Sequence, residues 1–146
     1  MFDPTTIAGP RLGRLHGYWD AKRGSRPMPA RADIDPLDFT WILGNVSLID
    51  VGAGGDFRWR LDGTNLVAFF GCDMTGRSIL DYPFPGHIAS LHASLREAVE
   101  ARAPLRTMRR FSSDAHRWDY ESLFLPLSAD GTRVDILLQG IEIERR

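Results

Sequence analysis

Residues Arg26–Phe39 read RPMPARADIDPLDF, and this stretch organises the first third of the chain. A residue that precedes proline avoids helical backbone angles, so 26–33 is predicted to be extended and to lie across the surface of the domain. Asp35 and Pro36 then form a strong helix start, because aspartate caps free amides and proline suits the first helical position. We therefore expect a short helix over 35–43.

The segment before this stretch favours one further helix. Residues 1–9 show no periodicity and contain proline and glycine, so they are predicted to be a loose lead-in. Over 10–23 the apolar side chains recur at helical spacing and share one face, and the residues concerned are Leu12, Leu15, Tyr18 and Trp19. The sequence thus predicts an N-terminal helix with one apolar side.

The segment after it predicts a sheet with two more helices. Apolar runs bounded by turn residues predict strands at 46–51, 57–61, 105–112, 117–127 and 133–143. Helices are expected at 64–70 and 85–102, and Asp130-Gly131 is expected to form the last hairpin turn. Helices, two strands, helices and three strands, in this order, predict an α+β fold with an antiparallel sheet and helices on one face.

Three further motifs accompany the opening stretch in a fixed order: FRWRLDGT from Phe57, DMTGR from Asp73 and YESLFLPL from Tyr120. Together the four resemble a PAS-domain family of small stand-alone alphaproteobacterial proteins, over about 15–143. The resemblance implies a five-stranded antiparallel PAS-like sheet with an extra N-terminal helix, and a module that senses or docks. One departure is Asp62, at a position where the family more often has an apolar residue.

The composition sets bounds on organisation and partners. Of the 146 residues, 43% are hydrophobic, which is typical of a globular domain. The net charge is −1, so no global charge attracts nucleic acid or anionic lipid. The lone Cys72 excludes an internal disulfide, and no secretory signal or run of 18 apolar residues occurs. We expect one cytoplasmic domain, with the lead-in and helix at 1–24 and the PAS core at 25–146, and no nucleic-acid or membrane partner.

A ligand pocket between the sheet and its helical cover follows from the resemblance. Apolar pockets are lined by aromatic and aliphatic side chains with a few polar anchors. The ligand-binding residues predicted on this basis are Phe69, Phe70, Met74, Phe84, His92, Met108, Trp118, Tyr120, Ser122 and Leu137. The alternative is that these side chains close-pack as core, which would favour a protein-docking scaffold without a ligand.

Cofactors and catalysis are weighed on the same residues. PAS domains can hold haem through one helical histidine, for which His92 is the better placed candidate, whereas Cys72 lacks the flavin-binding motif of light-sensing relatives. The cofactor is therefore unknown. A small isomerase or dehydratase would pair Asp119 or Glu121 with His92 or His116, but the simpler interpretation of Glu121 is a pair with Arg109 or Arg110. The sequence does not predict an enzyme.

The function predicted is therefore a sensory or regulatory module for bacterial signalling. Its ligand is a small apolar or amphipathic molecule, and a separate signalling protein is expected to detect the change in helix packing. Since flanking helices commonly make PAS dimers, the N-terminal helix is also expected to support a homodimer, and deletion of 1–24 to give a monomer.

Overall fold

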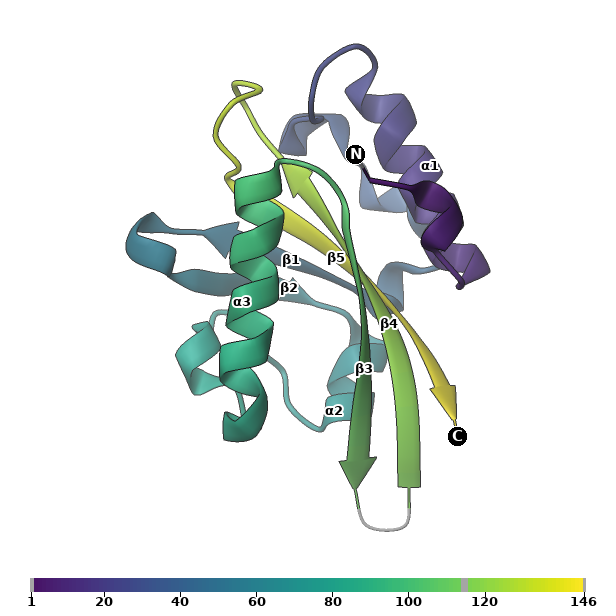
Figure 1. Ribbon diagram of the computed structural model, residues 1–146, viewed down its shortest axis with the longest axis vertical. Coiled ribbons are helices and arrows are strands. Elements are labelled where there is room, and N and C mark those ends of the chain that lie inside the picture. The colour runs from purple at the N-terminus through teal and green to yellow at the C-terminus, as the bar shows by residue number, and fades with distance from the viewer. Residues whose placement is uncertain (1, 114–115, 146) are drawn as a thin grey trace.

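The computed structural model describes residues 2–113 and 116–145, and an antiparallel sheet of five strands forms its centre (Figure 1). The strands are β1 Val46–Val51, β2 Phe57–Asp62, β3 Leu105–Ser113, β4 His116–Leu127 and β5 Ile136–Arg145. They lie in the order β2-β1-β5-β4-β3, so β5 is central and β2 and β3 are the edges. The predicted α+β fold with five antiparallel strands is confirmed.

The three α-helices begin and end close to the predicted positions. They are α1 Pro10–Arg23, α2 Thr64–Phe70 and α3 Pro85–Ala101. The helix predicted over 35–43 is wrong: two 3₁₀ turns, Pro36–Phe39 and Leu43–Asn45, stand in its place. Asp35 caps the Leu37 amide at 3.0 Å as expected, but so short a segment gains little from helix cooperativity.

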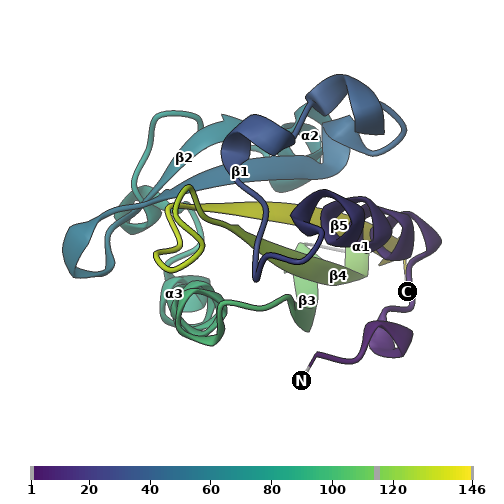
Figure 2. The same ribbon diagram turned by 90° about the horizontal axis from the view of Figure 1, so that it is seen from above.

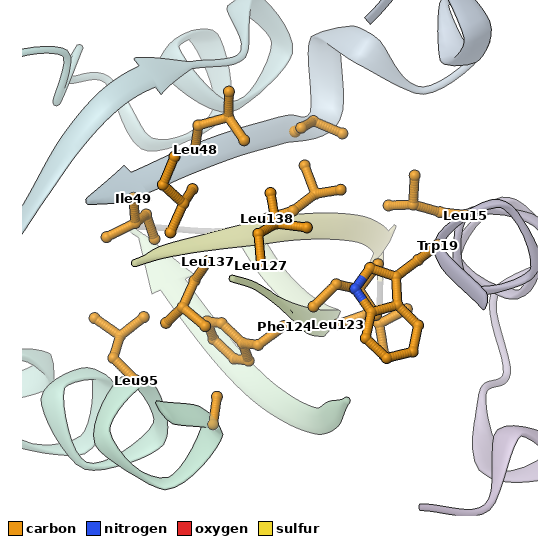
Figure 3. Close-up of a cluster of buried hydrophobic side chains, with 14 of the residues drawn as sticks. Leu15, Trp19, Leu48, Ile49, Leu95, Leu123, Phe124, Leu127, Leu137 and Leu138 are labelled. Atoms are coloured by element: carbon orange, nitrogen blue, oxygen red, sulfur yellow. The ribbon is translucent and has the colours of Figure 1, made fainter. Parts of the chain in front are cut away.

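Two layers cover the two faces of the sheet. Side chains alternate along each strand, so Leu137 belongs to one face and Leu138 to the other. We call the first the α3 face, because α3 and α2 pack on it, and the second the α1 face. Figure 3 shows Leu95 of α3 approaching from one side and Leu15 and Trp19 of α1 from the other.

Helix α1 is part of the core. Leu12 and Leu15 are fully buried, and a Cβ atom added at Gly140 would come within 2.8 Å of both side chains. The buried Trp19 donates from Nε1 to the Pro126 carbonyl oxygen at 2.9 Å. Figure 2 shows α1 and α3 apart, with strands β4 and β5 between them. The apolar side of α1 is thus already used within the chain.

The lead-in is held at its end, in contrast to the loose segment expected from the sequence. The amides of Ala8 and Gly9 donate to the Glu121 carboxylate at 2.9 and 2.7 Å. Arg106 donates from Nε to the same carboxylate at 2.5 Å, so the pairing arginine is neither Arg109 nor Arg110. A side chain that is 4% exposed therefore anchors the start of α1 to the α1 face.

The loops between the last three strands differ in how much is described. Between β3 and β4, residues 114–115 of the expected polar loop lie outside the described residues, and His116 begins β4. Between β4 and β5, strand pairing resumes only at Ile136, three residues later than predicted. Asp130 accepts from the amides of Thr132 and Arg133, so the turn is a longer loop closed by its own side chains.

Candidate functional site

A cavity of about 40 Å³ lies on the α3 face, between the sheet and the segment that runs from α2 into α3. A space of this size holds a few water molecules. Its lining combines apolar and polar side chains, and the residues are Ser47, Trp59, Asp62, Leu66, Phe70, Cys72, Met74, Tyr82, Pro83, Leu91, Arg109, Tyr120, Ser122, Gln139 and Ile141. It is the candidate site of the molecule.

The floor of the cavity is polar although it lies in the middle of the sheet. Ser47, Ser122 and Gln139 come from β1, β4 and β5, and each is at most 5% exposed. Ser47 pairs directly with Gln139, whose Nε2 donates to Ser122 Oγ at 3.3 Å. Burying polar groups costs free energy unless they are hydrogen-bonded, and each of these three side chains has a hydrogen-bond partner at the cavity, so the floor stays polar at little cost.

One edge of the cavity carries Asp62. It ends β2, where its Oδ1 accepts from Ser47 Oγ at 2.9 Å and its Oδ2 accepts from the Met74 amide at 3.0 Å. Burial raises the pKa of this carboxyl group above its ordinary value, although both hydrogen bonds lower it. Asp62 joins β1, β2 and the chain that covers the cavity.

Replacement of Asp62 by Asn tests this electrostatic cost. Because the pKa of Asp62 is raised in the folded state, the folded chain holds this proton more tightly than the unfolded chain. The fold therefore loses stability as pH rises from about 4 and Asp62 ionises. Asn can accept from the Met74 amide and donate to the Ser47 hydroxyl. We expect Asp62→Asn to be more stable than the natural chain at pH 7, by about 1 kcal/mol or less, and equally stable near pH 3. Urea unfolding at the two pH values measures this difference in unfolding free energy.

The exposed Asp73 supplies the control for that experiment. Hydrogen bonds from Thr75 lower its pKa, so the natural chain gains stability from Asp73 as pH rises, and Asp73→Asn should become less stable relative to the natural chain, the opposite trend. Equal pH profiles for Asp62→Asn and the natural chain would contradict the burial of the Asp62 carboxylate.

The cover of the cavity is a cluster of aromatic rings. The Phe70 ring lies edge-on to Tyr120 at 5.5 Å between centroids and edge-on to Phe69 at 4.8 Å. The Phe69 ring contacts Trp118, and the Tyr82 ring contacts Phe84. Such edge-to-face pairs stabilise a cover through many weak contacts, so α2 and the chain after it close the cavity mainly by ring packing.

The opposite edge carries Arg109 of β3. Its Nη1 donates to Ser90 Oγ, and its Nη2 donates to Ser90 O and Ser94 Oγ at 3.0 and 2.7 Å. The guanidinium thus ties β3 to α3. It forms no ion pair with any carboxylate in 2–113 or 116–145, and its Nε is buried without an acceptor there.

The predicted ligand-binding residues fall into three groups. Phe70, Met74, Tyr120 and Ser122 line the cavity, and Phe69, Phe84 and Trp118 belong to the ring cluster around it. Leu137 is fully buried core, His92 packs elsewhere, and Met108 lies on the α1 face and is 49% exposed. The prediction missed Asp62, Arg109 and Gln139, which only cross-strand register brings together.

The histidine considered for haem or catalysis has another contact. His92 donates from Nε2 to the Gly55 carbonyl oxygen at 2.8 Å, and its ring lies edge-on to Phe57. Glu121 lies on the α1 face, so the acid and base pair of Glu121 and His92, one of those considered for an enzyme, is separated by the sheet. Within 2–113 and 116–145, no group of three or more His, Cys, Asp or Glu side chains is arranged so that it could hold a metal ion.

Three solved structures are similar to this chain. The LOV protein of Rhodobacter sphaeroides is 15% identical with a TM-score of 0.52, covering 75% of this chain and 68% of its own. A PAS domain from Colwellia psychrerythraea is 16% identical with a TM-score of 0.49, covering 74% and 96%. A sensory box histidine kinase of Vibrio cholerae is 14% identical with a TM-score of 0.41, covering 74% and 90%.

At these identities the likeness to solved structures concerns the fold alone. No curated protein matches the chain. No helix in the part of the chain that the structure describes is long and apolar enough to cross a membrane. The PAS domain family, however, matches residues 8–141, which include α1, the whole cavity and all but the end of the sheet. The chain therefore belongs to the PAS domain family.

Proposed function

We propose that this chain is a sensory module for bacterial signalling, in which the cavity on the α3 face binds a small amphipathic ligand. The observation that carries the proposal is the buried polar floor under an aromatic cover, where the hydrogen-bonded side chains of Ser122 and Gln139 present polar groups to the cavity. Ligand pockets characteristically combine apolar walls with a few such groups. Membership of the PAS domain family supports a sensory role.

Binding is converted to a signal through the cover. Helix α2 has seven residues, with Leu66 buried against Tyr120 and Ile141, so it is a small element to displace. A ligand that favours one packing of α2 shifts the population toward that packing by its difference in affinity. A separate signalling protein then detects the altered surface. We place no catalytic step in this module.

Native mass spectrometry of protein purified gently from a bacterial host tests the proposal. A small molecule that is lost on denaturation, and lost from a Gln139→Leu variant, would support it. Ser128→Ala, a change of a buried polar residue outside the cavity, is the control and should keep the bound mass. A bound mass that survives Gln139→Leu would contradict the site.

A protein-docking scaffold is the second candidate, because a cavity of about 40 Å³ leaves the core nearly filled. Leu37 and Leu80 are 77% and 76% exposed and would be available to a partner. The homodimer stays a prediction, but the apolar side of α1 cannot supply its interface, since Leu12, Leu15 and Trp19 are buried within the chain. Deletion of 1–24 should then destabilise the fold rather than only separate subunits.

A further inference from the structure

Three hydrogen-bond donors of residues that line the cavity lack an acceptor within 2–113 and 116–145. Tyr82 and Tyr120 line the cavity, and neither phenol hydroxyl bonds to another group among the described residues. The third donor is the buried Nε of Arg109, whose terminal nitrogens are taken by Ser90 and Ser94. Arg109 pairs directly with Tyr120 across the two strands, and Tyr82 lies close enough to both of them to interact with them electrostatically.

The charge around these donors is positive. An arginine side chain remains protonated in proteins, and Arg109 has no carboxylate partner in the part of the chain that the structure describes. Burial raises the pKa of Tyr82 and of Tyr120, so both phenols keep their protons and stay donors at neutral pH. One cation and two neutral donors match the lone pairs of a single carboxylate.

We propose that the cavity binds a small monocarboxylate, with its carboxylate against Arg109, Tyr120 and Tyr82. This inference rests on the proposed function and names the class of ligand for that site. The apolar body of the ligand lies toward Leu66, Phe70 and Met74, which line the same cavity.

The far end of the cavity excludes a second anionic group. Asp62 lies on β2 and Arg109 on β3, the two edges of the sheet, so four strand spacings of about 4.8 Å separate their backbones. A dicarboxylate that reached from Arg109 toward Asp62 would bring a second negative charge to a carboxylate that has no ion pair with any described residue. A monocarboxylate with an apolar body meets neither problem.

The volume of the cavity couples this binding to a movement. At about 40 Å³ the space admits water but not the body of such a ligand. Entry therefore displaces Phe70 and Met74, and with them α2 and the chain that follows it. The carboxylate end stays fixed, because Arg109 is held by two serines of α3.

Phenylacetate and its neutral amide, phenylacetamide, form a matched pair of probes. We expect phenylacetate to shift the NMR amide signals of residues 62–84, 109 and 120 at pH 7, and phenylacetamide to bind at least about tenfold more weakly in calorimetry. Arg109→Gln should weaken phenylacetate binding about tenfold or more, and Tyr120→Phe should weaken it less. Arg110→Gln is the control, because this substitution removes the same charge from a side chain that is exposed on the α1 face.

The outcomes separate the ligand class from the proposed function. Equal binding of acid and amide, or equal loss in Arg109→Gln and Arg110→Gln, would overturn the monocarboxylate while the cavity remained a ligand site. The monocarboxylate would also be overturned if phenylacetate caused no NMR shifts while the native mass spectrum showed a bound neutral molecule. If Arg109→Gln does not fold, Tyr120→Phe and the two probes on the natural chain still decide the question.

Discussion

Replacement of Gly63 by Ala is expected to destabilise the protein by about 3 kcal/mol, a cost at the upper end for overpacking. A Cβ atom at Gly63 would lie 2.3 Å from the Gly44 carbonyl oxygen and 2.9 Å from the Val46 carbonyl oxygen. Both are backbone atoms, so no side-chain rotation relieves the overlap, and the start of α2 must move away from β1. We expect urea unfolding to show the loss.

Gly17→Ala is the matched control for this substitution. Gly17 lies inside α1, and a Cβ atom there would have no neighbour within 4 Å. Alanine is the better helix former, so Gly17→Ala should stabilise the chain by about 0.5–1 kcal/mol. If both variants unfolded at the same urea concentration as the natural chain, the close approach of Gly63 to Gly44 would be refuted.

The fold was largely predictable because local signals and the global topology agree. The apolar positions of α1 and the alternation in the strands fixed these elements within a few residues, and Pro10 and Pro85 begin α1 and α3. The segment 35–43 was mispredicted because a capping aspartate and a proline mark the start of any helical turn, whereas continuation depends on tertiary packing. Phe39 and Ile42 there are anchored in the core.

The cavity was less predictable because its residues are far apart in the sequence. Phe70, Met74, Tyr120 and Ser122 could be named from their types, since aromatic and small polar residues characterise pockets. Arg109 reads as a surface charge in a strand, and only its register with Tyr120 and its contacts with α3 bring it to the cavity. Met108 precedes Arg109 in β3 and therefore lies on the opposite face of the sheet, the α1 face.

The N-terminal anchor leads to the second large effect. Glu121 faces Glu142 directly across β4 and β5, and two like charges in this arrangement repel each other. Arg106 pairs with Glu121, and Arg11 donates to Glu142 at 2.9 Å. The amides of Ala8 and Gly9 supply further donors close to the positive end of the α1 dipole. The pair is tolerated because two arginines neutralise it and the amides of the lead-in add hydrogen bonds.

Glu121→Ala should therefore lower stability by about 3 kcal/mol at pH 7, because it leaves the part-buried amides of Ala8 and Gly9, and Arg106, without their acceptor. Glu144→Ala, an exposed carboxylate on the same face, should change little. Hydrogen exchange provides the local measurement, since the amides of Ala8 and Gly9 should lose protection in Glu121→Ala alone. Unchanged protection would show that the carboxylate does not hold the lead-in.

The pH dependence of the same contact has a definite sign. Burial alone would raise the pKa of Glu121, but the hydrogen bonds from Ala8, Arg106 and Gly9 outweigh it and hold the pKa below its ordinary value. The folded chain then binds this proton less tightly than the unfolded chain, so the stability due to Glu121 is present at neutral pH. It disappears as pH falls from about 4.3 through the folded-state pKa. The difference in unfolding free energy between the natural chain and Glu121→Ala should therefore shrink in acid, and a constant difference would assign the loss to packing instead.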